Sequence, residues 1–214
     1  MSVSGDMAEV KRSYDSSRRH EQARRNRDAV LDAAERRFLT DGYGLTTIAS
    51  VAGEAGVSAE TVYKAFGGKA GLVTAIWERG LEGRGPVPAP QRSDEMRARE
   101  EDPRQIIRNW GQLTTEVAPR VAPILLLIRT AAASDPEMAR MLAATDRQRL
   151  QRMRQNAETL TGHLKEGLSR NDAAEILWTY SSPDLYDLLV IRRRWSIGRY
   201  GRFISEAMIN ALFE

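Results

Sequence analysis

The stretch that decides the fold is Thr46–Lys69, TTIASVAGEAGVSAETVYKAFGGK. Ala52 is small enough for two short helices to cross there, and Gly56 follows where the chain must reverse and a positive φ is favoured. Ser58 is a good N-cap for the second helix, and Val62 returns to the first. This spacing predicts a helix-turn-helix, whose second helix reads DNA in proteins that carry it. The alternative is an ordinary tight αα-hairpin.

The flanking segments also predict helices. One apolar stripe upstream recurs at helical spacing and is expected to end near Asp41–Gly42; it consists of Val30, Leu31, Ala34 and Phe38. Downstream, Gly67 and Gly68 break the second short helix, and Lys69 opens a fourth. The buried face predicted for that fourth helix consists of Leu72, Val73, Ile76 and Trp77.

Residues 24–80 resemble the TetR family of bacterial transcriptional regulators, through the segments RRNRDAVLDAAERRF and DGYGLTTIASVAGEAGVSAETVYKAFGGKAGLV. The resemblance implies an N-terminal three-helix DNA-binding unit, followed by a variable helical domain that binds a ligand and dimerises. The chain departs from the family pattern at Ala65, Gly68 and Gly71, where an aromatic residue or His, a polar cap and an acidic residue are usual.

The resemblance also implies which residues face DNA. These are Thr46, Thr47, Ser58, Ala59, Glu60, Thr61, Tyr63, Lys64 and Lys69. In the family the first two positions open the second helix and touch phosphate, and Lys69 corresponds to the lysine that opens the fourth helix. Residues 58–61 match the turn that faces base edges, where Thr61 can meet a thymine methyl and Glu60 can accept from cytosine. Glu60 alternatively only stabilises the N-terminus of its helix.

A basic segment precedes the motif. Between Arg18 and Arg27 the chain has five arginines and one acid, Glu21, although its formal net charge is only +3. Such an arm can run along phosphates or enter a minor groove, and Arg24 and Arg25 are therefore candidate DNA contacts. A solvated helix start is the alternative.

Composition excludes several classes of protein. The chain has no Cys, which excludes disulfides and thiolate metal sites, and no apolar run near the roughly 18 residues that a membrane helix needs. Its N-terminus has no apolar core typical of a secretory signal, so a cytoplasmic protein is expected. His20 and His163 stand far apart, and neither they nor the many acids form a catalytic or metal-binding pattern. We expect no enzyme activity, metal or cofactor.

The sequence predicts an all-α protein in four parts. Residues 1–20 are a flexible arm, 21–82 the helix-turn-helix unit, 83–103 a linker or mobile loop rich in Gly, Pro and charge, and 104–214 the effector-binding and dimerisation domain. In the last part we expect one helix stopped at Pro119 and a short one opened by Pro123. A long helix begins at Ser134–Glu137 and ends at Gly167, and two apolar helices follow.

Two sets of candidate residues lie in the C-terminal part. The apolar and aromatic side chains expected to surround a ligand are Trp110, Leu113, Val117, Leu126, Met141, Trp178 and Tyr180. They suit an apolar or aromatic effector, although ordinary core packing would use the same residues. The stripe expected to pair with a second copy in a four-helix bundle consists of Leu185, Leu188, Tyr200, Ile204 and Met208. Burial within one subunit is the alternative, and Arg192–Arg194 suit a helix C-terminus.

These observations favour a regulator that binds a palindromic DNA operator as a homodimer, represses transcription and is released by a small effector. A ligand-binding or protein-interaction module without operator-specific binding is the alternative, and an enzyme is a third possibility that lacks a supporting motif. The operator, the regulated genes and the effector are not encoded in any recognisable pattern.

Overall fold

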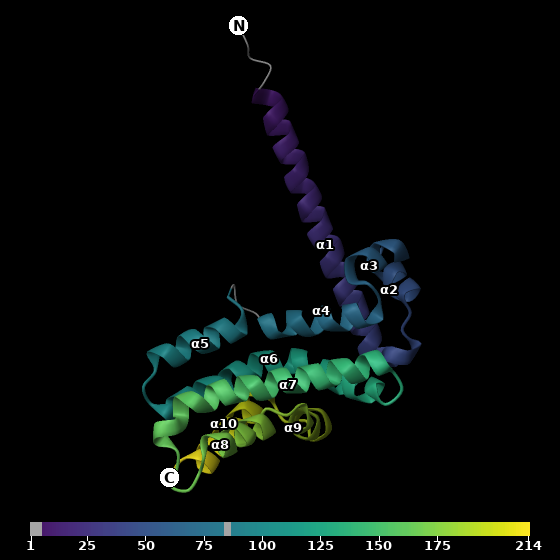
Figure 1. Ribbon diagram of the computed structural model, residues 1–214. Helices are drawn as coiled ribbons and strands as arrows, with labels where there is room; N and C mark the ends of the chain where they lie inside the picture. Colours follow the sequence, from purple (N-terminus) through teal and green to yellow (C-terminus); the bar gives the residue numbers. More distant parts are fainter. Residues whose placement is uncertain (1–5, 84–86) are drawn as a thin grey trace. The chain divides into compact units, whose positions relative to one another are not determined.

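The computed structural model describes residues 6–83 and 87–214, with side chains from residue 20 onward. Every regular element in these ranges is a helix, and none is a strand, which confirms the all-α prediction (Figure 1). The chain divides into two compact units, residues 1–75 and 76–214. The division therefore falls inside the fourth helix rather than after residue 82, because the second half of that helix belongs to the second unit's core.

The first unit consists of α1 (Asp6–Leu45), α2 (Ile48–Ala55), α3 (Ala59–Phe66) and the start of α4 (Lys69–Glu82). The predicted break near residue 42 is present: Gly42 has a φ of 83° and interrupts the helical backbone of α1. The segment predicted as a flexible arm is helical from Asp6 onward, and residues 1–5 lie outside the described residues.

Caps and glycines shape the helix-turn-helix as predicted. Thr47 caps α2 in a capping box with Ser50. Gly56 ends α2 with a φ of 69°, the left-handed conformation that suits glycine. Ser58 then caps α3 by accepting a hydrogen bond from the backbone N–H of Thr61, and Gly67 ends α3 in a second left-handed turn. Local sequence signals alone therefore set both ends of the second short helix.

Side chains from α1, α2, α3 and the start of α4 form the core of this unit. Its largest fully buried members are Phe38 and Leu72, together with the smaller Val51 and Val62. Only one side chain of α3 is buried, which leaves most of that helix free for another role.

Ion pairs and close backbone contacts fix the helices of this unit at its surface. Glu54 of α2 pairs with Arg36 and Arg37 of α1, and the hydrogen bond from Arg36 lowers the pKa of the Glu54 carboxyl. The departure from the family pattern at Gly71 also has a structural reason. A Cβ at that position would lie 1.7 Å from the carbonyl oxygen of Phe66, so that only glycine fits where α3 turns into α4.

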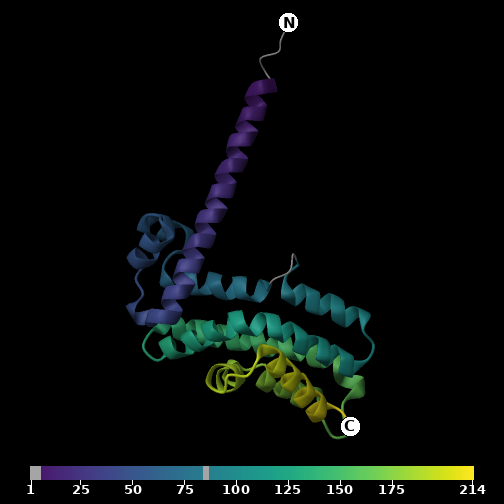
Figure 2. The same cartoon turned by 180° about the vertical axis from the view of Figure 1, so that it is seen from behind.

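The second unit consists of α5 (Ala89–Arg99), α6 (Pro103–Ala132), α7 (Pro136–Leu160), α8 (Arg170–Tyr180), α9 (Pro183–Tyr186) and α10 (Ile197–Leu212), with the end of α4. A 3₁₀ turn, Thr161–His163, follows α7, and a π-helical turn, Asp187–Arg192, follows α9. Helices α6 and α7 lie side by side, with α5 on one side of the pair and α8 and α10 on the other (Figures 1 and 2).

The predicted break at Pro119 is wrong, because α6 runs through both Pro119 and Pro123 as one helix. Each proline removes one backbone donor from the helix. The loss is tolerated because α6 is packed on several sides, against α5, α7, α9 and α10. Buried residues on both sides of the prolines, Trp110 and Ile128 among them, hold the whole helix in place.

Helix α7 starts as predicted, with Asp135 as its N-cap, but it ends at Leu160 rather than at Gly167. The chain becomes extended at Leu164. The backbone N–H of Lys165 then donates to the carbonyl of Leu212 in α10, at 2.9 Å, and no longer to its own helix. A tertiary hydrogen bond therefore holds the chain that follows this helix against α10.

The segment 83–103, predicted as a linker or mobile loop, contains helix α5, apart from residues 84–86, which lie outside the described residues. Several of its charged side chains are paired. Arg92 donates two hydrogen bonds to Glu116 of α6, at 2.6 and 3.0 Å. Asp94 pairs with Arg152 of α7 at 2.8 Å. The loop prediction failed because it treated these charges as solvated.

Three of the residues predicted for the dimer interface are instead part of the second unit's core. Tyr200, Ile204 and Met208 are buried within the single chain, and Ile204 exposes only 1% of its surface. They are buried because α10 packs closely on α6: a Cβ at Gly201 would lie 2.7 Å from the carbonyl oxygen of Gly111. The stripe was correct as an apolar face, but the face is covered by the same chain.

Candidate functional site

The first candidate site is the outward face of α3. Val62 is its only buried side chain, and Glu60, Thr61, Tyr63 and Lys64 are exposed. The Tyr63 side chain stands out most clearly, since an aromatic ring that exposes 55% of its surface is unusual without a partner. An exposed face with a carboxylate, hydroxyls and an ammonium offers both donors and acceptors to base edges and phosphates.

The residues at the ends of the short helices have structural roles as well. Thr47 and Ser58 are exposed, but each already accepts a hydrogen bond from a backbone N–H as an N-cap. The Ser58 and Thr61 hydroxyls also lie 2.9 Å apart. Ala59 is half-buried and offers only a methyl group. A DNA contact by these side chains therefore remains a prediction.

Thr46 is not available to DNA, which corrects the prediction made for it. It is 1% exposed, and its hydroxyl donates to the carbonyl oxygen of Gly42 at 2.8 Å. This hydrogen bond holds the turn between α1 and α2. The neighbouring Thr47, which is exposed, is left as the phosphate candidate at this position.

Lys69 has partners inside the first unit. Its Nζ donates to the carbonyl oxygen of Tyr43 at 2.8 Å and lies 4.3 Å from the centre of the Tyr43 ring. An ammonium group has three donors, and a phosphate contact by Lys69 is a prediction that these contacts do not test. Replacing Lys69 would nevertheless disturb the turn as well as any contact with DNA.

The basic segment of α1 is exposed on its described side chains. Arg24 and Arg25 both face solvent, and Arg25 pairs only loosely with Glu21, at 3.5 Å. Arg27 instead stacks over the Phe66 ring of α3, 4.6 Å from its centre. The first two arginines therefore remain candidates for phosphate contacts, and the side chains of residues 18 and 19 lie outside those described.

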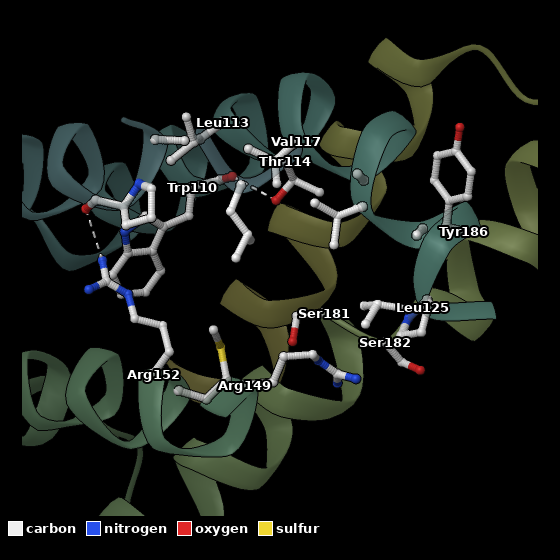
Figure 3. A pocket seen from close by; sticks show the side chains of 18 of the residues that line it. Trp110, Leu113, Thr114, Val117, Leu125, Arg149, Arg152, Ser181, Ser182 and Tyr186 are labelled. Carbon is white, nitrogen blue, oxygen red and sulfur yellow. Dashed lines mark hydrogen bonds between the residues drawn. The ribbon is translucent and has the colours of Figure 1, made fainter. Parts of the chain in front are cut away.

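The second candidate site is a cavity of about 390 Å³ inside the second unit. This volume lies in the roughly 300–1,000 Å³ range of small-molecule sites. Helices α6 and α7 provide much of its wall, with α4, α5, α9 and α10 completing it (Figure 3). Most of the wall is apolar, through residues such as Trp77, Leu125 and Met153.

Three of the seven residues predicted to surround a ligand line this cavity: Trp110, Leu113 and Val117. They follow one another at helical spacing along α6. This spacing is the feature of the sequence that predicted them to share one face of a helix. The other four do not line it; they are Leu126, Met141, Trp178 and Tyr180. The Trp178 ring instead lies 5.0 Å from the guanidinium of Arg149.

The sequence prediction missed the polar residues of the cavity. Arg149, Arg152 and Asn156 lie along one face of α7, and Thr114, Ser181, Ser182 and Tyr200 also line the wall. The α7 residues have a spacing of three and four, on the same stripe as Met153. Polar side chains that recur on an apolar stripe are a signal of a lined cavity, and this signal was present in the sequence.

Tyr200 joins the cavity wall to the core. Its ring packs edge-on against Tyr186, with the ring centres 5.7 Å apart. Burial raises the pKa of the Tyr200 hydroxyl to about 12, so the group stays protonated at any physiological pH. It is therefore a neutral polar group on the wall.

Exposed apolar side chains lie elsewhere on the second unit, on the π-helical turn, on the segment after it and on α10. Leu188, Ile191 and Phe203 expose between 40% and 47% of their surfaces, and Trp195 packs edge-on against Phe203. Leu188 is the one predicted interface residue in this patch, since Leu185 is half-buried against the core. We call these four residues, Leu188, Ile191, Trp195 and Phe203, the apolar patch.

In the part of the chain that the structure describes, no group of three or more His, Asp or Glu residues gathers as a metal site would need. No described helix is both long and apolar enough to cross a membrane.

Comparison with known proteins concerns both units. Residues 30–76 match the family model described as bacterial regulatory proteins, tetR family. This segment contains α2, α3 and the parts of α1 and α4 that pack around them, which are the elements that position the exposed face of α3. Among curated proteins, none matches this sequence.

Solved structures share the fold over nearly the whole chain. NalD, the secondary repressor of the MexAB-OprM multidrug efflux pump in Pseudomonas aeruginosa, aligns with a TM-score of 0.71 and 19% identity, over 91% of this chain and 98% of that one. SmeT, the repressor of the Stenotrophomonas maltophilia multidrug efflux pump SmeDEF, gives 0.64 and 22%, over 88% and 90%. The SmeT–triclosan complex gives 0.68 and 22%, over 88% and 92%. At these identities the likeness shows a common fold.

Proposed function

We propose that this chain, whose N-terminal unit belongs to the TetR family of bacterial regulatory proteins, is an effector-responsive transcriptional repressor. It binds a palindromic DNA operator as a homodimer, and a small apolar or aromatic molecule in the cavity of the second unit releases it. The observation that carries the proposal is the exposed face of α3, a capped helix that buries only one of its side chains.

The DNA-binding part of the proposal is supported by how α3 is held. Its two ends are fixed by the Ser58 cap and the Gly67 turn, and Arg27 stacks on Phe66 at its last turn. A short helix held at both ends presents its outer side chains in a fixed orientation, which base recognition requires. Glu60 and Thr61 lie in the first turn, the part that enters the major groove in helix-turn-helix proteins.

The effector part of the proposal is supported by the cavity. Its volume and its apolar walls suit a small organic molecule. SmeT, which shares the fold, has been solved with triclosan, an observation on that protein that fits a ligand-binding role for this unit.

The dimer is supported by the apolar patch, although not by the residues first predicted. Leu188, Ile191 and Phe203 are large, exposed and apolar, and two copies related by a twofold axis would cover them. The patch is thus the proposed surface between copies. Two recognition helices in one particle would read half-sites about one helical turn, or a multiple, apart.

A gel shift on the DNA upstream of the chain's own gene tests the proposal. We expect a complex whose affinity falls steeply as salt rises. Lys64→Ala should lower the slope of the log–log salt dependence by about one unit. Arg154→Ala, an exposed arginine on α7 of the second unit, is the matched control and should leave the slope unchanged.

The alternative function, a ligand-binding module without operator binding, predicts a different outcome. In that case the protein would bind apolar molecules in its cavity, but every DNA fragment would show the same weak, non-specific affinity. The same gel shift, run with an unrelated fragment of equal length, separates the two functions.

A further inference from the structure

The charges around the cavity are unequal. Two arginines, Arg149 and Arg152, line it, and no Asp or Glu is among the described residues of its wall. Both rise from α7, but they point to different ends (Figure 3). Arg152 points toward the Trp110 end, and Arg149 toward the end where Ser181 and Ser182 lie. An apolar cavity of this kind therefore has a positive electrostatic potential.

Arg152 is neutralised by its neighbours. It pairs with Asp94 of α5 at 2.8 Å, and it also donates to the carbonyl oxygen of Pro90 at 3.3 Å. The hydrogen bond that Arg152 donates to Asp94 lowers the pKa of the Asp94 carboxyl, which stays ionised at neutral pH. The charge at this end of the cavity is thus compensated inside the protein.

The positive charge of Arg149 is compensated much less than that of Arg152. Its side chain is 14% exposed, and its one carboxylate partner, Asp146, is 3.5 Å away and lies outside the cavity wall. Asp184 is also near, but it pairs with Arg129. The guanidinium also donates a hydrogen bond to the carbonyl oxygen of Trp178, at 3.0 Å, besides the long one to Asp146. Burial lowers the pKa of Arg149, yet an arginine stays protonated at neutral pH, so a largely buried positive charge remains.

Three polar atoms of the wall have no hydrogen-bond partner among the described residues. They are Nε of Arg149, Nε1 of Trp110 and Oδ1 of Asn156. Trp110 and Asn156 are more than nine-tenths buried. A buried polar group without a partner costs roughly 1–3 kcal/mol, so a ligand that supplies the partner gains affinity. The Nε–H of Arg149 is a donor that an anionic group at the Ser181 end satisfies, whereas the Nε1–H of Trp110 lies toward the opposite end, beside Arg152.

We propose that the cavity selects an apolar molecule carrying one acidic group, a carboxylate or an ionised phenol, and that Arg149 binds that group. This inference rests on the proposed function and specifies its effector class. The anion replaces the weak partner Asp146 with a direct one, while the aromatic and aliphatic wall of α6 covers the rest of the molecule. Cations of the same shape are disfavoured, because they would approach a guanidinium whose charge is only weakly compensated.

Three probes of nearly equal size test the charge preference. They are 4-phenylbutyrate, 4-phenylbutyramide and 4-phenylbutylamine, which carry an anion, a neutral amide and a cation on the same apolar body. Each is used to displace a neutral apolar dye, N-phenyl-1-naphthylamine, from the full-length protein. We expect the acid to bind at least about tenfold more tightly than the amide, and the amine to be weakest.

Variants of α7 assign the preference to one residue. Arg149→Gln should bring the affinity for the acid down to that for the amide, and Arg149→Lys should restore part of the difference. Arg147→Gln, at an exposed position two residues away, is the matched control and should behave like the wild-type protein. The thermal unfolding curve of each variant shows whether its fold is intact, and the lysine variant keeps the test decisive if the glutamine variant unfolds.

The possible results distinguish a failure of the proposed anion site from a failure of the proposed effector-responsive regulation. If the amide or the amine binds as well as the acid, or if Arg149→Gln keeps the preference, the anion site is wrong while the cavity stands. If the dye binds but no probe displaces it, the anion site is also wrong. If the dye itself does not bind, the cavity is not an effector site, and the proposed regulation fails with it.

Discussion

The two units of this molecule carry their candidate sites in opposite ways. In the first unit the site is an exposed face of α3, held by caps and glycines that lie within a few residues of it. In the second unit the site is a buried cavity whose wall comes from helices spread between residues 77 and 200. A site built from local signals can be recognised in a sequence, whereas a site built from distant ones depends on how the helices pack.

The two units also differ in whether the predicted surface is available to a partner. On α3 the exposed residues are those that the motif assigns to DNA. On α10 the apolar stripe was assigned to a partner subunit, but α6 of the same chain covers it. Periodicity shows that a face is buried, and it does not show what buries it.

The largest expected effect concerns α10. Ile204→Asp would place a carboxylate in the core of the second unit without a partner, at a cost of several kcal/mol, so we expect that unit to lose its fold. Phe203→Asp, one residue away but 41% exposed, should leave the helical content unchanged and split the proposed dimer. Circular dichroism and sedimentation velocity of both variants check this. A folded, dimeric Ile204→Asp protein would mean that the stripe is not part of the core.

Base recognition by α3 gives the next largest effect. Glu60→Ala and Thr61→Ala should each relax the preference at one symmetric pair of operator positions, at a cost of about 1–3 kcal/mol. Binding to a library of single-base operator variants measures this directly. Glu60→Gln is a useful companion, because it keeps the size of the side chain. Unchanged preference profiles for both alanine variants would leave Glu60 with only a role at the helix N-terminus.

The Ser58 cap gives a smaller effect of a different kind. Ser58→Ala removes the acceptor for the backbone N–H of Thr61, and we expect a loss of about 1 kcal/mol in the stability of α3. Because the whole helix frays, affinity should fall alike for all operator variants. Ser196→Ala removes the equivalent cap of α10 in the other unit and serves as the control. A change in base preference with Ser58→Ala would indicate a direct contact instead.

The smallest effect concerns Asp94 on α5, the helix mistaken for a linker. Because the Arg152 hydrogen bond lowers the pKa of this carboxyl in the folded protein, the pair stabilises the fold above about pH 4 and loses that contribution as the pH falls through the folded pKa. The side chain is 44% exposed, so screening limits the effect to under about 1 kcal/mol. Thermal unfolding of Asp94→Asn and wild type should differ at pH 7, and the difference should shrink as the pH falls through the lowered pKa of the folded protein. A difference that persists in acid would show that the pair is not responsible.

Much of the fold could be predicted from the sequence. The helix-turn-helix, the break at Gly42, the cap at Ser58 and the start of α7 at Asp135 all follow from local signals, and the structure has them. The failures have a common cause. Pro119 breaks an isolated helix but not one packed on several sides, and the chain after α7 leaves the helix and bonds to α10 at Lys165. Such tertiary contacts have no counterpart in local sequence.

The sites show the same limit. Trp110, Leu113 and Val117 were found because they share a stripe on one helix, while Arg149 and Asn156 were missed because only apolar and aromatic side chains were considered for the wall. Thr46 was assigned to DNA by its position, but its hydroxyl holds a turn. Correspondence to a position in a family motif therefore predicts where a residue lies in the fold more reliably than it predicts the role of its side chain.

Selection of binding sites from a random DNA library with the full-length protein tests the central claim most directly. We expect a motif with dyad symmetry, its half-sites about one helical turn or a multiple apart, and we expect Glu60→Ala to loosen the same position in both halves. Symmetry would show that two copies of α3 read the DNA together. No enriched sequence, or an enriched motif that Glu60→Ala, Thr61→Ala and Lys64→Ala all leave unchanged, would contradict the assignment of DNA recognition to this helix.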